Sequence, residues 1–161
     1  MTRILAIDPG PIESGWVRYN PDDPGYIIEF GIMENRELKH MVRGASRHAF
    51  PYVLAIEMIA GYGLKVGSEV FETCLWAGRF EEAFNPDEDS LRCYRKDICE
   101  YLCDNRNAGD PWVKKALIDR FGPPGTKGSP GPTYGIKSHV WAALAVAVYA
   151  ADQLTKANHP T

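Results

Sequence analysis

The sequence predicts an α/β fold in which a mixed β-sheet is flanked by helices. Three consecutive segments near the N-terminus have the short, apolar, β-branched composition of strands, and helix-like and strand-like segments alternate after them. Neighbouring strands followed by such alternation are typical of a sheet that contains both antiparallel and parallel pairs. The 161 residues show no internal repeat and no domain boundary, so we expect one domain over residues 1–161.

The first half of the chain supplies four of the expected strands. An apolar run that ends at Asp8-Pro9-Gly10 predicts a buried strand entering a turn, and a Pro-rich connection over residues 21–25 joins the next two strands. A polar segment with spaced apolar residues predicts a helix before the fourth strand. We therefore expect strands at 3–7, 15–19, 26–32 and 52–56, and a helix at 34–47.

The second half is mostly helical, because its apolar residues recur at helical spacing. One of its shorter helices is expected to begin with Asp110 as N-cap and Pro111 in the first position. Helices are expected at 67–84, 96–103, 111–121 and 138–154, a short strand at 90–94 and a loop at 122–135.

The net charge of −3 argues mildly against a protein that binds nucleic acid over its whole surface, but the charge is unevenly distributed. Between residues 91 and 137, nine basic residues stand against five acidic ones, a local charge of +4. A local basic surface can bind phosphates whatever the sign of the whole chain. A solvated surface of mixed charge explains the same composition equally well.

No apolar run is long enough to cross a bilayer, and the N-terminal segment meets a charge too early for a secretory signal. We therefore expect a cytoplasmic protein whose four cysteines stay reduced. Cys93, Cys99 and Cys103 are close enough in sequence to raise the alternative of a structural zinc site. The absence of a Cys-x-x-Cys pair and of a nearby histidine favours free thiols.

An acid ends each of two predicted buried strands. Asp8 follows the apolar run Ile-Leu-Ala-Ile, and Glu57 follows Val-Leu-Ala-Ile. Carboxylates at the ends of adjacent strands would lie close together, where their charges repel. A divalent cation relieves that repulsion, and hard oxygen ligands suit Mg²⁺ or Mn²⁺. In the alternative interpretation, Asp8 caps its Pro-Gly turn and Glu57 pairs with a lysine.

Several motifs resemble those of the RuvC family of Holliday junction resolvases, in the family's order and over nearly the whole chain. They are Ile7-Asp8-Pro9-Gly10 followed by Ser14-Gly15-Trp16, then Ala55-Ile56-Glu57, the helix from Gly67 to Arg79, and the Ala-rich stretch 141–147. The amino-acid sequence of residues 116–121 and 131–135 resembles bacteriophage members of the family more closely than bacterial ones. The resemblance to phage members implies that the protein works in the cytoplasm of a bacterial host.

The resemblance implies an RNase H-like fold and the hydrolysis of phosphodiester bonds in branched DNA, assisted by Mg²⁺ or Mn²⁺ with two ions per site. It implies that Asp8 bridges the ions and that Glu57 binds beside it, both as catalytic residues. A homodimer is implied as well, because a four-way junction has two-fold symmetry, and the helix at 67–84 is its expected interface. Neither a nucleotide cofactor nor a membrane is implied.

The closing helix departs from the family pattern. The family has two ligands one helical turn apart, an acid or histidine and then an acid, where this chain has His139 and Ala142. A histidine can bind a metal through a ring nitrogen, so His139 is a candidate catalytic ligand, unless it is only a helix-end residue. Alanine cannot ligate, and Asp110 is the candidate to replace the missing acid, although capping its helix is the plainer role.

Basic and aromatic residues near these motifs are the candidates for DNA contacts. The glycine-rich segment 58–63 suits a loop that moves and stacks Tyr62 on bases, although packing of Tyr62 on the protein surface is an equal alternative. The segment 122–129 lacks the order of residues of a Walker phosphate loop, so we expect a flexible basic loop there. The expected DNA-binding residues are Tyr62, Lys65, Arg95, Lys96, Lys114, Lys115 and Lys127.

The leading prediction is a homodimeric, structure-selective endonuclease. A RuvC-like module that binds branched DNA without cutting it is the second interpretation, and Ala142 is the residue that favours it. An actin-like phosphotransferase that binds a nucleotide is the third, because the first strand of that class also ends in an acid. The short chain and the absence of a second phosphate loop count against this third class.

Overall fold

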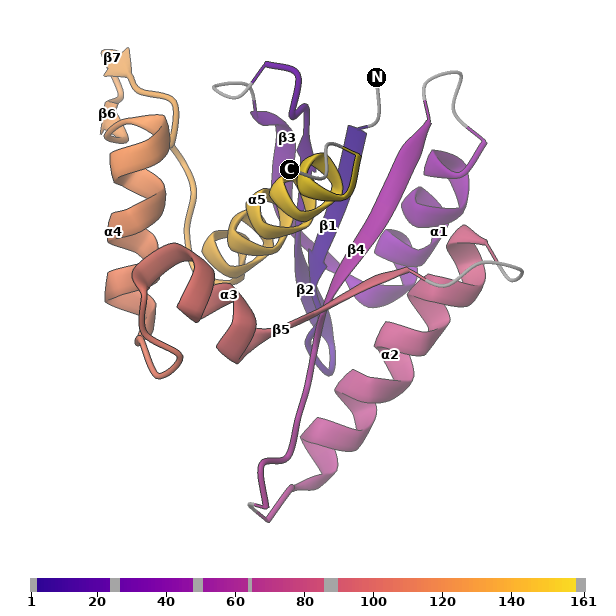
Figure 1. Ribbon diagram of the computed structural model, residues 1–161. Helices are drawn as coiled ribbons and strands as arrows, with labels where there is room; N and C mark the ends of the chain where they lie inside the picture. The colour runs from indigo at the N-terminus through magenta and orange to yellow at the C-terminus, as the bar shows by residue number, and fades with distance from the viewer. Residues whose placement is uncertain (1–2, 24–26, 48–50, 64, 86–89, 159–161) are drawn as a thin grey trace.

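A five-stranded mixed sheet forms the centre of the molecule, with the strand order β3-β2-β1-β4-β5 (Figure 1). The computed structural model describes residues 3–23, 27–47, 51–63, 65–85 and 90–158. β1 and β3 both pair antiparallel with β2, whereas β4 pairs parallel with β1 and with β5, as the predicted mixed sheet requires. The strands are β1 (Arg3–Asp8), β2 (Glu13–Tyr19), β3 (Ile27–Glu34), β4 (Tyr52–Met58) and β5 (Leu91–Tyr94).

The central strand β1 is buried on both faces, which explains its uninterrupted apolar run. Ile4 and Ala6 belong to one core cluster, whereas Leu5 and Ile7 belong to the other, and all four are fully buried. Successive side chains of a strand point to opposite faces, so only an unbroken apolar sequence can fill both cores.

Helices cover both faces of this sheet. α1 (Asn35–Ala45) and α2 (Ser68–Phe84) pack on the face of Leu5 and Ile7. On the other face, α5 (His139–Asn158) packs against β1 and β2, and α3 (Arg95–Cys103) and α4 (Asp110–Phe121) pack beside it (Figure 1). Residues 143–148 of α5 are all fully buried, and the small alanines among them let the helix lie close to the strands.

The start of α4 differs from the prediction. α4 includes Asp110, and the N-cap position is held by Gly109, without any side-chain capping hydrogen bond. The carbonyl of Gly109 accepts from the amides of Trp112 and Val113, so the helix begins one residue earlier than expected. The prediction that Asp110 caps this helix is therefore wrong.

The expected loop at 122–135 also contains a short hairpin, formed by β6 (Gly125–Thr126) and β7 (Ser129–Pro130). Residues 24–26, which include part of the expected connection and the first residue of the expected third strand, lie outside the described residues. Within the described ranges, no helix is both long and apolar enough to cross a lipid bilayer.

Candidate active site

Two acids lie side by side where the parallel strands β1 and β4 end. Ile7 pairs with Ile56 in the register of these strands, so Asp8 and Glu57 occupy the next position on each. Both acids line a pocket of about 640 Å³, together with Asp110 of α4 and His139 of α5. One pocket at this edge of the sheet is therefore lined by the four side chains that the sequence suggested as metal ligands. Arg95, Lys114 and Ala142 line the same pocket, as do Pro111, Val113, Ser138 and Trp141.

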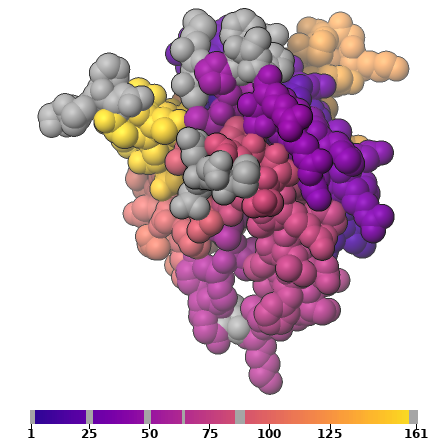
Figure 2. Space-filling view, turned by 90° about the vertical axis from the view of Figure 1, so that its right-hand side faces the viewer, coloured from indigo at the N-terminus to yellow at the C-terminus, as the bar shows by residue number. Residues whose placement is uncertain are grey.

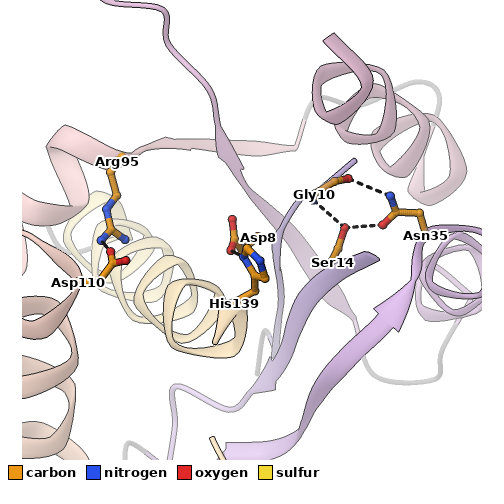
Figure 3. A network of polar contacts seen from close by, with 7 residues as sticks. All are labelled: Asp8, Gly10, Ser14, Asn35, Arg95, Asp110 and His139. Atoms are coloured by element: carbon orange, nitrogen blue, oxygen red, sulfur yellow. Dashed lines mark hydrogen bonds and ion pairs between the residues drawn. The ribbon is translucent and has the colours of Figure 1, made fainter. Parts of the chain in front are cut away.

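Asp8 and His139 form a direct contact, with 2.8 Å between Asp8 Oδ2 and His139 Nδ1 (Figure 3). The Asp8 side chain is largely buried, whereas 52% of the His139 side chain is exposed. The hydrogen bond to Asp8 raises the pKa of His139 above its ordinary value, against the opposing effect of burial. The contact fixes the imidazole ring beside the carboxylate at the end of β1.

A glycine allows this contact to form. Gly15 of β2 pairs with Asp8 across the antiparallel ladder, and the first turn of α5 lies directly against its backbone. A Cβ atom on Gly15 would lie 2.5 Å from the backbone carbon and oxygen of His139, closer than real Cβ atoms approach. Ser138 precedes His139 with a positive φ of 46°, a conformation that non-glycine residues rarely adopt.

Glu57 is held in surroundings that oppose its charge. Burial and, after it, the nearby charge of Asp8 raise the pKa of Glu57 to about 7, against the lowering effect of Arg95. Its Oε2 atom is buried and accepts no hydrogen bond from any described residue. No described lysine pairs with Glu57, in contrast to the alternative interpretation. A buried carboxylate oxygen without a partner, next to a second carboxylate, fits a hard divalent cation.

Asp110 and Arg95 form a second ion pair on the wall of the same pocket (Figure 3). Arg95 is the first residue of α3 and reaches the pocket from the end of β5. The Asp110 side chain is 92% exposed, whereas only 27% of the Arg95 side chain is exposed. The guanidinium of Arg95 thus lies within electrostatic reach of Glu57, whose pKa it lowers.

The α5 wall of the pocket carries no second ligand. Ala142 lines the pocket one helical turn after His139, at the place where the resemblance to the RuvC motifs implies an acid. Within the described ranges, no three side chains of His, Cys, Asp or Glu are already grouped closely enough to hold a metal ion. The four cysteines are free, and Cys93 and Cys99 are buried.

Two buried polar residues, Ser14 and Asn35, hold the turn that follows Asp8. The sequence did not predict that they interact. The Gly10 amide donates to Ser14 Oγ at 3.1 Å, and this hydroxyl donates to Asn35 Oδ1 at 2.6 Å (Figure 3). Asn35 Nδ2 in turn donates to the Gly10 carbonyl at 2.9 Å, and the Asn35 amide donates to Ile12. These bonds hold the turn without help from Asp8, which was the alternative role for that acid.

The predicted DNA-binding residues are not all at the pocket. Arg95 and Lys114 line it, and Lys114 Nζ lies 5.2 Å from the ring centre of Trp141. Lys96 Nζ lies 3.9 Å from the ring centre of Tyr62, which is 52% exposed and has a positive φ of 43°. Lys65 and Lys127 are exposed, and Lys115 pairs with Asp119 at 2.5 Å.

No family model and no curated protein matches this chain. Among solved structures, it is similar to the RuvC of Thermus thermophilus, with 17% sequence identity and a TM-score of 0.68 over 95% of this chain and 96% of that chain. A structure of T. thermophilus RuvC in complex with a Holliday junction substrate gives 15% identity and a TM-score of 0.72 over 95% and 97% of the two chains. At these identities the similarity concerns the fold. The chain has the RNase H-like architecture of RuvC, a mixed five-stranded sheet flanked by helices, which confirms the predicted fold.

Proposed function

We propose that this chain is a single-domain, divalent-metal-dependent endonuclease that cuts four-way junctions and related branched DNA by phosphodiester hydrolysis. One observation carries the proposal: Asp8 and Glu57 end adjacent parallel strands, and the buried Glu57 Oε2 has no partner among the described residues. A cation is the simplest partner for that oxygen. The RuvC structure bound to a Holliday junction substrate, which shares this fold, supplies the class of DNA.

The residues present fit Mg²⁺ or Mn²⁺, and two ions per site would match the two-metal nucleases. Asp8, Glu57 and His139 would hold the metal, which supplies a Lewis acid and an activated water when it is bound. Asp8 engages Nδ1 of His139, so it fixes the ring and leaves Nε2 as the ring nitrogen for a ligand. Arg95 and Lys114 on the pocket wall would draw the DNA phosphate toward the two acids.

Contacts away from the pocket would hold the DNA by its backbone and by stacking. Tyr62 is exposed, and Lys96 Nζ lies over its ring in a cation–π contact, so the ring is available to stack on an unpaired base. Lys65 and Lys127 offer exposed charges to phosphates, as does Lys115 where it can leave Asp119. Such contacts select the shape of a junction more than its sequence.

A homodimer would present two such pockets to a two-fold symmetric junction. α2 exposes Phe71 and Leu75, which lie one helical turn apart and are 61% and 54% exposed. Figure 2 shows α2 along the outer surface of the molecule, where a second copy can reach it. The dimer would use this face. The amino-acid sequence of residues 116–121 and 131–135 resembles that of bacteriophage members of the RuvC family. This resemblance supports a phage-type protein that acts in its host's cytoplasm.

A cleavage assay on a synthetic four-way junction with Mg²⁺ or Mn²⁺ tests the proposal. Asp8→Asn and Glu57→Gln should abolish cutting and preserve junction binding, because each removes a charge and keeps the shape of the side chain. Wild-type protein that binds the junction but cuts it with neither metal would support the second candidate, a binding module without catalysis, which Ala142 favours. Full cutting by Asp8→Asn would remove the basis of the proposed site.

A further inference from the structure

The pocket has an acid on α4, Asp110, but none on α5. At Ala142 the α5 wall offers only a methyl group, although this position lies one turn after His139 and faces the pocket. On the facing wall, α4 brings the carboxylate of Asp110 into the same pocket. The pocket therefore holds three carboxylates and one histidine, and the third carboxylate, that of Asp110, comes from α4 and not from α5.

Asp110 is an acid in the first turn of α4, where its charge interacts favourably with the helix dipole. It makes no capping hydrogen bond to α4, because Gly109 occupies the N-cap position. Asp110 pairs with Arg95, and this pair is open to solvent on the side of Asp110, whose side chain is 92% exposed. An exposed ion pair contributes little stability, commonly less than about 1 kcal/mol, so Asp110 can leave Arg95 at small cost.

Arg95 and Asp110 act on the same acid in opposite directions. The charge of Arg95 favours the ionised form of Glu57, and the charge of Asp110 opposes it, so both lie within electrostatic reach of Glu57. The guanidinium thus stands beside the paired acids as a positive charge that the protein itself supplies. A cation bound by those acids would compete with Arg95 for Asp110.

We propose that Asp110 is the acidic metal ligand that replaces the one missing at Ala142, and that Arg95 is its exchangeable partner. The inference rests on the proposed metal-dependent function. Asp110 pairs with Arg95 in the metal-free protein and turns to the cation when one is bound. The freed guanidinium then offers its planar pair of N–H donors to the non-bridging oxygens of the scissile phosphate. This exchange couples binding of the cation by Asp110 to binding of the phosphate by Arg95.

The first test measures Mn²⁺ binding to the metal-free full-length protein by calorimetry, without DNA. Asp110→Asn should weaken Mn²⁺ binding by about tenfold or more, in the range seen when groups that support a metal ligand are removed. Asp119→Asn is the matched control, because it removes the same charge from an exposed ion pair on the same helix, away from the pocket. The control should bind Mn²⁺ like the wild type.

A relocated acid provides the second test. Ala142→Asp in the Asp110→Asn background should restore Mn²⁺ affinity, because it returns a carboxylate to the pocket from the α5 side. Arg95→Ala should tighten Mn²⁺ binding, because it removes the competitor for Asp110, and should slow cutting at saturating metal. A purely structural ion pair would give the reverse pattern, in which both single variants lower the melting temperature and neither changes Mn²⁺ affinity.

The outcomes separate this inference from the proposed function. If Asp110→Asn binds Mn²⁺ as tightly as Asp119→Asn while Glu57→Gln binds it weakly, the role of Asp110 is disproved and the nuclease proposal stands. If the wild type binds no Mn²⁺, or Glu57→Gln binds it like the wild type, both are overturned. Weak binding by Asp110→Asn together with restored binding by the double variant supports the exchange.

Discussion

The buried carboxyl of Glu57 is held at a cost to stability. Its raised pKa means that the folded protein binds a proton more readily than the unfolded chain between about pH 4.5 and pH 7. Stability of the metal-free protein should therefore fall as pH rises through this window and level off above it. The ordinary carboxyl environment would instead give no pH dependence from this residue.

Because stability falls as Glu57 ionises, removing its charge should stabilise the metal-free protein at high pH. In EDTA at pH 8, Glu57→Gln should be more stable than the wild type by roughly 3 kcal/mol, the free-energy equivalent of a shift of this size. At pH 4.5 the advantage should shrink, because the wild-type carboxyl is then protonated. Urea unfolding at the two pH values measures both numbers. Equal differences at both pH values would show that burial of the charge is not responsible.

Gly15 matters because it has no side chain, which allows the backbone of His139 to approach β2 closely. A methyl group there cannot fit against the backbone of His139, so Gly15→Ala should push the first turn of α5 away from β2 and break the Asp8–His139 contact. We expect a loss of about 1–3 kcal/mol, as for other overpacked positions, together with weaker Mn²⁺ binding. Urea unfolding and calorimetry measure the two effects.

Gly44 and Gly78 provide the matched controls, since a Cβ at either helical position meets no atom within 4 Å. Alanine there should raise stability by about 0.5–1 kcal/mol, because it restricts the unfolded chain and favours the helix. A rise in stability on Gly15→Ala like that of these controls would contradict the packing argument.

At the residue scale, the sequence predicts the site unevenly. Asp8 and Glu57 are visible because a charge rarely ends a run of residues that is buried on both faces. His139 is visible only through a motif, since a lone histidine at a helix start has no physical signature of its own. The Arg95–Asp110 pair could not be predicted, because 15 residues separate its members and only the packing of α3 against α4 brings them together.

At the element scale, the start of α1 supports the end of β1. Asn35, the first residue of α1, is fully buried and links Gly10, Ile12 and Ser14 in the turn after Asp8. No pattern in the sequence points to Asn35, because its partners lie 21 and 25 residues away. Buried polar groups of this kind specify a conformation, because each loses a bonding partner in any alternative one.

Asn35→Ala should therefore disturb the site through the turn. We expect a loss of about 1–3 kcal/mol, because the hydroxyl of Ser14 and the carbonyl of Gly10 lose partners in a buried place. The turn positions Asp8, so kcat for junction cutting should fall with little change in KM. Asn107→Ala, at an exposed asparagine, should alter neither quantity. A normal kcat in a destabilised Asn35→Ala protein would restrict Asn35 to a structural role.

The elements were predictable to the extent that they rest on local pattern. The order of strands and helices around the sheet follows from apolar periodicity and is confirmed. The start of α4 and the hairpin of β6 and β7 do not follow from it. Gly109 takes the cap position in an extended conformation, and Gly125 takes a positive φ of 68°, choices that depend on backbone geometry more than on side-chain polarity.

At the scale of the whole molecule, the exposed apolar face of α2 bears on assembly. Phe71→Glu with Leu75→Glu should convert the proposed dimer to a monomer, because both changes place charges where a second copy would bury the helix. Light scattering coupled to gel filtration measures the mass. Trp112→Glu, which alters a residue 65% exposed on α4, is the control and should leave the dimer intact. A wild-type protein that is monomeric at every concentration would contradict this prediction.

The last prediction concerns how a chain with a net charge of −3 would bind the branched DNA proposed as its substrate. Its affinity must come from a few cations at one surface, and the structure separates two adjacent lysines that sequence reasoning treated alike. Lys114 lines the pocket, whereas Lys115 is engaged with Asp119 on the same helix.

Each phosphate contact releases close to one counterion, so Lys114→Ala should reduce the slope of log affinity against log salt by about one, whatever the DNA sequence. Lys115→Ala should reduce it by less, because leaving Asp119 offsets part of what the lysine gains from a phosphate. Fluorescence anisotropy of a labelled four-way junction over a range of salt concentrations measures both slopes. Equal reductions in the two variants would mean that the binding surface extends across the outer face of α4, and that the pocket is only one part of a wider basic footprint.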